Sequence, residues 1–410
     1  MMRSMFSAIS GLKNHQTFMD VVGNNIANVN TTGFKQSRVT FQDILSQTLR
    51  NASGPQNGRG GVNPEQVGLG VILGGVETVQ SQGTLQSTGK VTDMAIQGDG
   101  YFVVSDGRQN FYTRDGAFDL GMDGTLVNPA TGLKVMGWQA DPVTGAVDSS
   151  LPPTSISIPV GAGMTGKAST TLTATGNLDA SAASTASVPL SATVYDSLGN
   201  SHQLTVTFTK PSPTSNQWQY TVSDATNPTL AQGNVTFTTA GKYDTTANTP
   251  ATVNLPLTNG ATTPESFSLD LSQLTQLSSA SNLSSNTDGA SAGSLTTFSV
   301  GSSGEITGVY SNGYKQPLGQ IALASFQNPS GLMKAGSNLF STSPNSGNAA
   351  IGAPDSGGRG QIATGFLEGS NVDLAQQFTN MIMAERGFQA NSRVITTSDE
   401  ILQDLVNIKH

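Results

Sequence analysis

The two ends of this 410-residue chain carry apolar residues at heptad spacing, and the long segment between them does not. In both end segments the apolar positions advance by three or four residues, with Gln16 the only polar member of the first stripe and Glu385 the only charged member of the second. Such spacing forms one face of an α-helix, so we expect one helix at each end. The stripe residues are Met5, Ile9, Leu12, Met19, Val22 and Ile26, then Leu374, Phe378, Met381, Phe388, Ile395, Leu402 and Leu405.

These two helices can pair with each other as a coiled coil. We expect Leu374, Phe378, Met381 and Phe388 to pack on the N-terminal helix. One interpretation is an intramolecular pair that closes a stalk. The other is that a narrow pair cannot bury such wide stripes, so that the apolar faces require further copies of the chain. The pattern favours this second interpretation.

Single residues refine the picture of the two helices. Ser370, with Asp373 three positions later, has the spacing of a capping box and predicts the start of the C-terminal helix. Gly11 lowers helix propensity by about 1 kcal/mol, which close approach of a neighbouring helix would offset.

The first helix ends in the asparagine-rich stretch "GNNIANVNTTGFK", residues 23–35. Asparagine is a poor helix former, but its amide can donate and accept and can fix the register of crowded helices. We therefore interpret Asn24, Asn25 and Asn28 as contacts between helices of several subunits. Asn30 and Gly33 are expected to adopt positive φ and redirect the chain. The alternative is a solvated helix end.

The middle of the chain reads as β-structure. The segments 93–104, 111–120 and 193–210 are strand–turn–strand patterns with Asp-Gly and Gly-Asn corners. Stretches at 141–153 and 278–293 are expected to cross between one domain and another inserted in it. The predicted fold is mixed and mainly β. Its parts are a terminal helical coiled coil at 1–33 and 366–410, a linker or stem at 34–75, an inner β-domain at 76–149 and 291–365, and an inserted outer β-domain at 150–290.

Composition excludes several classes of function. Charged residues make up 11% of the chain, against roughly 25% in ordinary domains. The net charge of −8, with no basic run, disfavours nucleic acid. The absence of cysteine excludes disulfides and thiolate chemistry. No apolar run has the length of a membrane span, and the N-terminus lacks the pattern of a cleaved secretory signal.

No chemical motif withstands inspection. The stretch 161–169 resembles a phosphate loop, but Ala168 stands where the magnesium-binding hydroxyl belongs. Asp115, Asp119 and Asp123 lack the alternate spacing of a calcium loop. We assign no catalytic, cofactor or metal residues. A carbohydrate-active enzyme or adhesin built on the β-middle stays open as an alternative, because a carboxylate pair is not recognisable from sequence.

Specific motifs at both ends and in the first third carry a family resemblance. "VGNNIANVNTTGFK" (22–35) and the segment 367–407 are similar to the N- and C-terminal signatures of the bacterial flagellar rod and hook family of axial proteins. Segments 83–104 and 112–128 resemble its shared core domain. The chain length and the segments 193–210 and 313–326 resemble the hook branch, with the distal rod as the alternative.

The resemblance implies a structural protein. Many copies would form a curved, flexible, hollow tube that joins rod to filament and transmits motor torque as a universal joint. It implies export through the flagellar type III apparatus without a cleaved signal, and a place in the extracellular hook. The implied partners are other hook subunits, the distal rod, the hook cap and the hook–filament junction proteins. No nucleic acid and no membrane insertion are implied.

Overall fold

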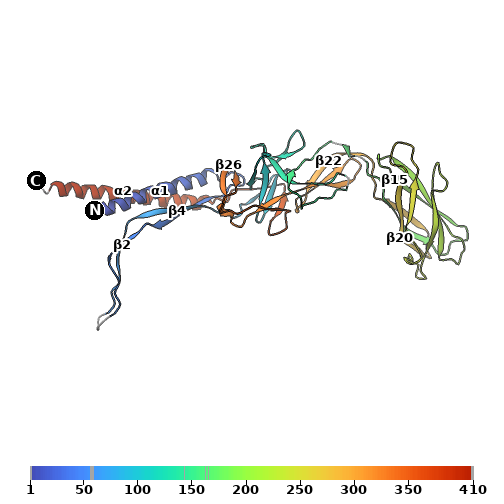
Figure 1. Ribbon diagram of the computed structural model, residues 1–410, viewed down its shortest axis with the longest axis horizontal. Helices are drawn as coiled ribbons and strands as arrows, with labels where there is room; N and C mark the ends of the chain where they lie inside the picture. Colours follow the sequence, from blue (N-terminus) through green and yellow to red (C-terminus); the bar gives the residue numbers. More distant parts are fainter. Residues whose placement is uncertain (1, 56–59, 143, 162, 165, 408–410) are drawn as a thin grey trace.

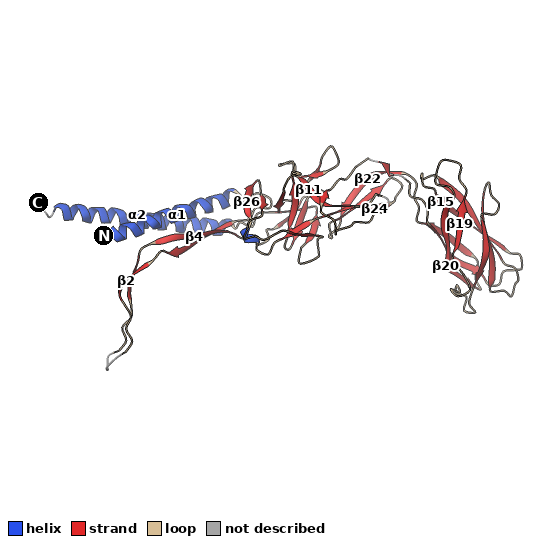
Figure 2. Cartoon of the chain, in the orientation of Figure 1, coloured by secondary structure: helices blue, strands red, loops and turns tan. Residues whose placement is uncertain are grey.

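The computed structural model describes all residues except 1, 56–59, 143, 162, 165 and 408–410. The molecule is long, with two helices at one end, a β-rich centre and a second β-unit at the far end (Figure 1). Helix α1 (Met2–Ala27) and helix α2 (Leu374–Asn407) lie side by side. The prediction of a mainly β chain with paired terminal helices is confirmed (Figure 2).

The centre contains a 14-stranded sheet built from two separate stretches of the chain. Side chains alternate across β7 (Tyr101–Ser105), so that Phe102 and Val104 enter one hydrophobic core and Tyr101 and Val103 another. The first stretch supplies β7, β8 (Asn110–Thr113), β9 (Asp119–Leu120), β10 (Leu126–Val127), β11 (Lys134–Gln139), β12 (Thr154–Ser155) and β13 (Gly163–Met164). The second supplies β22 (Gly293–Val300), β23 (Glu305–Tyr310), β24 (Lys315–Ile321), β25 (Leu323–Ser325), β26 (Met333–Gly336), β27 (Leu339–Ser341) and β28 (Ala350–Gly352), with the short 3₁₀ helix η1 (Pro329–Gly331).

Two smaller pairings close the centre toward the helices. Strand β6 (Met94–Gln97) pairs with β29 (Gln361–Thr364), and β5 (Leu85–Ser87) pairs with β30 (Phe366–Glu368). Both pairs join the first stretch to the segment that leads into α2. The chain therefore leaves and re-enters the helical end through adjacent strands.

The far unit consists of two four-stranded sheets that share one core. Strand β16 shows why, because Leu204, Val206 and Phe208 alternate with less buried residues and face the other sheet. One sheet is β19 (Ala251–Leu255), β20 (Glu265–Leu277), β14 (Thr171–Asp179) and β21 (Asn282–Thr287). The other is β15 (Ser187–Tyr195), β16 (Ser201–Thr209), β17 (Gln217–Asp224) and β18 (Ala231–Thr236).

The predicted linker at 34–75 folds into a projecting antiparallel arm (Figure 1). Strand β1 (Ser37–Asp43) pairs with β4 (Val71–Thr78), and β2 (Ser46–Arg50) pairs with β3 (Glu65–Gly68). The base of the arm is fixed to α1, since Asn14 Nδ2 donates to Val71 O at 2.8 Å. Beyond Asp43 the residues of β2 and β3 are exposed.

Three details differ from the sequence predictions. Ile156 and Ile158 are buried in the central core, although we had assigned 150–290 to the outer domain. The segment 278–293, expected as a crossing, contains strand β21 of the far unit. The cap of α2 is Asp373, not Ser370, because Asp373 Oδ1 accepts from the backbone N–H of Ala375 at 2.9 Å and of Gln376 at 3.2 Å.

Candidate assembly surface

Helices α1 and α2 are antiparallel and hold a constant register. Asn25 of α1 bonds to Gln377 of α2, with 3.1 Å between Nδ2 and Oε1. Further along, His15 faces Gly387 and Gly11 faces Asn391. Each step forward along α1 is thus matched by an equal step backward along α2.

The contact between the helices is formed by small and polar residues and, of the apolar stripes, by Val22. We call this contact the helix seam. The seam residues buried on α1 are Ala8, Gly11, Val22 and Asn25, and those on α2 are Gln377, Ala384 and Ser398. The α2 members are spaced by seven or fourteen residues, so the seam follows a heptad of its own, next to the apolar stripe.

The apolar stripes lie mostly beside the seam. Phe378, Leu374 and Phe388 are 51%, 41% and 37% exposed, so much of their surface is uncovered in the single chain, and their packing on α1 stays a prediction. Ile9 and Leu405 are also exposed, and Val22 is the one stripe residue that is fully buried in the described part of the two helices. The remaining predicted residues are partly buried, namely Met5, Leu12, Met19, Ile26, Met381, Ile395 and Leu402.

Other exposed apolar side chains on the helices were missed by the stripe pattern. On α1 these include Phe6, which is 62% exposed, and on α2 Ile382 and Val406. They are neighbours of stripe residues, so a broader apolar sector would have included them. We call the exposed apolar residues of both helices the flank surface. Its main members are Met2, Phe6, Ile9, Leu374, Phe378, Ile382, Met383, Phe388, Val394, Ile401, Leu405 and Val406.

The asparagines of the opening stretch have different surroundings. Asn25 is 1% exposed, and its amide is fully used inside the chain. Its Nδ2 donates to Ser37 O at 2.8 Å and to Gln377, while its Oδ1 accepts from Ser37 N at 2.9 Å. Asn25 therefore joins α1, the first arm strand and α2 within one chain, which corrects its assignment as a contact between subunits.

Asn24 and Asn28 lie at the open side of the same helix end. Asn24 is exposed, and Asn28 Nδ2 donates to Asn24 O at 2.9 Å. Both line a pocket of about 290 Å³ together with Lys334 and Phe340 of the β26–β27 hairpin. Their predicted role between subunits stays a prediction.

Asn25→Ala should destabilise the isolated chain. The substitution removes the side-chain partner of Ser37 N, Ser37 O and Gln377 Oε1 in a buried site, at a cost of about 1–3 kcal/mol. Thermal unfolding of the monomer measures this loss. The exposed neighbour provides a matched control, because Asn24→Ala removes the same amide and should leave the melting temperature nearly unchanged. Equal melting temperatures for the two variants would contradict the role of Asn25.

The chain turns away from α1 at Gly33. Its φ is +66°, and a Cβ there would lie 2.5 Å from Asp115 N, so glycine is required. Its N–H donates to Glu368 O at 2.8 Å. The prediction of positive φ is confirmed for Gly33. It is wrong for Asn30, because the described non-glycine residues with positive φ are Thr185, Ser337, Asn338 and Asp355.

A buried charge cluster lies directly below this turn. Lys35 Nζ is 2.7 Å from Glu368 Oε1, and Arg114 Nη1 is 3.3 Å from Glu368 Oε2. The three side chains are 5% exposed or less. Gly83 N also donates to Glu368 Oε1, at 2.9 Å. One carboxylate thus joins the exit from α1, the central sheet and the entry to α2.

Burial dominates the electrostatics of this cluster. Desolvation lowers the pKa of Lys35 even though Glu368 opposes the shift. Desolvation also raises the pKa of Tyr101 to about 12. The Tyr101 ring lies 5.3 Å from the Arg114 guanidinium carbon, and its hydroxyl donates to Gln80 at 2.7 Å. Sequence reasoning missed all of these residues.

The stretches that resemble a phosphate loop and a calcium loop have other roles in the structure. Around 161–169 the described residues lead from β13 to β14 and form no helix, and Lys167 Nζ lies 5.8 Å from the Tyr314 ring centroid. Asp119 and Asp123 pair with Lys90 and Lys134 at the surface. Within the described ranges, no three histidine or acidic side chains form a group that could hold a metal.

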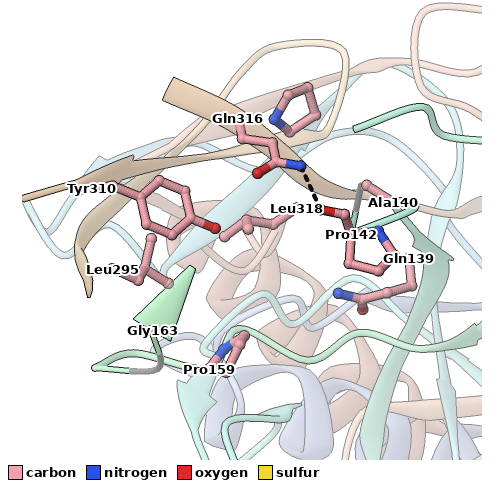
Figure 3. A pocket seen from close by; sticks show the side chains of 10 residues that line it. Gln139, Ala140, Pro142, Pro159, Gly163, Leu295, Tyr310, Gln316 and Leu318 are labelled. Atoms are coloured by element: carbon pink, nitrogen blue, oxygen red, sulfur yellow. Dashed lines mark hydrogen bonds between the residues drawn. The ribbon is translucent and has the colours of Figure 1, made fainter. Parts of the chain in front are cut away.

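A pocket of about 220 Å³ lies where β13 meets β22 (Figure 3). Gln316 Nε2 donates across it to Pro142 O at 3.0 Å. Its other lining residues are Gln139, Ala140, Pro159, Gly163, Leu295, Tyr310, Pro317 and Leu318, so no carboxylate is among the described residues that line it. This pocket offers no acid pair for glycoside cleavage.

Neither helix is long and apolar enough, over its described residues, to cross a membrane.

Four flagellar families match the chain in order. They are a basal body rod protein at 5–35, a hook protein D1 domain at 95–180, a basal body FlaE D2 domain at 164–290 and a rod protein C-terminal region at 363–408. These matches cover most of both helices, the far unit and the first of the two stretches that form the central sheet.

Relatives of full length match as well. The flagellar hook protein FlgE of Treponema pallidum is 41% identical over 464 aligned residues, and that of Borreliella burgdorferi 40% over 448, each covering 100% of both chains. The basal-body rod protein FlgG of Bacillus subtilis is 34% identical, again over 100% of both chains. In fold, the crystal structure of Helicobacter pylori hook protein FlgE2 aligns with a TM-score of 0.53 at 17% identity, covering 69% of this chain and all of that one.

Proposed function

Because the chain belongs to the flagellar hook and rod family of axial proteins, we propose that it is a hook subunit that assembles into a curved, flexible, hollow tube. The tube joins rod to filament and transmits motor torque as a universal joint. The family is structural rather than enzymatic. Self-assembly, curvature and the binding partners of this chain are proposed below from its surfaces.

The flank surface is the observation that carries self-assembly. It exposes large apolar side chains along both helices, and contiguous exposed apolar surface marks an interaction site. The helix seam leaves this surface free, so a second copy is the natural occupant. A contact that uses different patches on the two partners generates an open helical array when it does not close.

The projecting arm supports the same proposal. Leu49 on β2, Val67 on β3 and Leu45, directly before β2, are exposed beyond the arm's contact with α1. A two-stranded ribbon with apolar side chains is marginal alone in water. We propose that the arm packs on neighbouring copies and adds to the contacts of the terminal helices.

The far unit supports the proposed role as a universal joint. Its strands carry Ser, Thr and Asn on their outer faces, and such weakly charged surfaces suit wet interfaces that exchange contacts as the tube turns. Partners at the tube ends would be the distal rod, the hook cap and the hook–filament junction proteins. Export would follow the flagellar type III route to the extracellular hook.

Electron microscopy of the purified full-length chain tests the proposal. At raised concentration and salt we expect curved tubes, because screening and mass action favour burial of the flank surface. A chain limited to 34–365, which lacks both helices, should stay monomeric under the same conditions. Straight tubes would assign the chain to the distal rod instead. Tubes from the shortened chain would contradict the role of the terminal helices.

A further inference from the structure

Two glycines of the helix seam face polar side chains of the opposite helix. On α1, a Cβ at Gly11 would lie 2.7 Å from Asn391 Nδ2. On α2, a Cβ at Gly387 would lie 2.5 Å from His15 Nε2. Gly11 and His15 are four residues apart, as are Gly387 and Asn391. The two contacts are therefore reciprocal, since each helix supplies one glycine and, one turn later, one polar side chain.

The surroundings hold both side chains in place. Asn391 Nδ2 donates to Gly387 O at 2.9 Å, which couples the two contacts along α2. The His15 ring lies between α2 and Phe41 of the arm, with ring centroids 6.4 Å apart. His15 Nδ1 is buried without a hydrogen-bond partner among the described residues, so packing rather than hydrogen bonding fixes this ring.

We propose that Gly11 and Gly387 determine the register of the helix pair, each by leaving room for one polar side chain of the other helix. A shift of α2 by one heptad would set His15 against Val394 or Asn380, both of which carry side chains where the ring now lies. The pair consequently has one register. That register decides which apolar residues of α1 and α2 lie next to each other in the flank surface.

The inference concerns the single chain and does not depend on the proposed function. Replacing glycine by alanine in a helix usually stabilises it, because alanine has the higher helix propensity. At Gly11 and Gly387 the inference predicts the opposite, a loss of stability. Gly23 of α1 provides the matched control, because a Cβ there meets nothing within 4 Å. Gly23→Ala should therefore stabilise α1, whereas Gly11→Ala and Gly387→Ala should loosen the pair.

Amide hydrogen exchange of the full-length chain, followed over α1 and α2, tests the inference. We expect exchange near the seam to accelerate about tenfold or more in Gly11→Ala and Gly387→Ala, because overpacking must displace Asn391 or His15. Exchange should slow in Gly23→Ala. In the double variant Gly387→Ala with His15→Ala, the missing ring admits the new methyl group, and exchange should return toward that of His15→Ala alone.

Three results would overturn the inference. Slower exchange in Gly387→Ala, as in Gly23→Ala, would mean that the ring moves aside without cost. Failure of His15→Ala to restore the Gly387→Ala variant would mean that the loss arises elsewhere. Unchanged exchange in Gly11→Ala or Gly387→Ala would also refute the register assignment. Loss of tubes by such a variant would then be an effect on assembly alone.

Discussion

Glu368→Gln should lower the free energy of unfolding of the junction between the helices and the central sheet by about 3–5 kcal/mol. The substitution keeps the shape of the side chain but removes the carboxylate that is bonded to both Lys35 and Arg114. Two buried cations would then lose the carboxylate bonded to both of them, and breaking a buried ion pair from one side has this order of cost. Urea unfolding of the full-length monomer measures the effect.

A matched substitution at the surface separates burial from charge. Glu77 pairs with Arg38 at 2.7 Å, the same distance that joins Lys35 to Glu368, but the two side chains are 51% and 67% exposed. Exposed ion pairs contribute about 0–1 kcal/mol, so Glu77→Gln should leave the urea midpoint nearly unchanged. Similar losses in the two variants would show that burial of the Glu368 cluster contributes little.

The elements that could be predicted from the sequence are those set by patterns among neighbouring residues. Both helices followed from apolar spacing, and the hairpin of β15 and β16 followed from alternation around a Leu-Gly-Asn corner. Gly33 was predictable because an Asn-rich helix end before a glycine is typical of a chain reversal. These features depend on neighbours in sequence, so one sequence suffices to read them.

The helix seam could not be read in the same way. Its members, such as Ala8, Gly11 and Ser398, are small or polar and contribute little to a hydrophobic pattern, so the apolar stripe beside them dominated the prediction. Gly11 alone gave a usable signal, through its cost to helix propensity. What remained hidden was its partner Asn391, because register between distant helices is not encoded locally.

The charge cluster shows the same limit more strongly. Lys35 and Glu368 are 333 positions apart, and although each lies within a terminal family signature, nothing in either signature indicates that the two side chains meet. The ion pair between them forms only because β5 pairs with β30 and the chain turns at Gly33. The arm was hidden for another reason, since its exposed strands alternate weakly and resemble a linker.

Phe378→Asp should prevent tube assembly while leaving the single chain folded. Phe378 is half exposed in the chain, so the substitution costs the monomer little. If Phe378 becomes buried against another copy, an unpaired carboxylate there costs several kcal/mol. A loss of about 3 kcal/mol per contact raises the critical concentration about 100-fold or more. Sedimentation of tubes across a concentration series measures this shift.

The next residue supplies the control that makes the result specific. Thr379 is exposed, lies outside the flank surface, and its hydroxyl donates only to Ala375 O within its own helix. Thr379→Asp adds the same charge one position away on the same helix and should assemble near the wild-type concentration. Equal inhibition by both variants would indicate general charge repulsion among copies. Normal assembly of Phe378→Asp would remove this part of α2 from the interface and leave Ile401 and Leu405, at its other end, as the apolar residues through which copies meet.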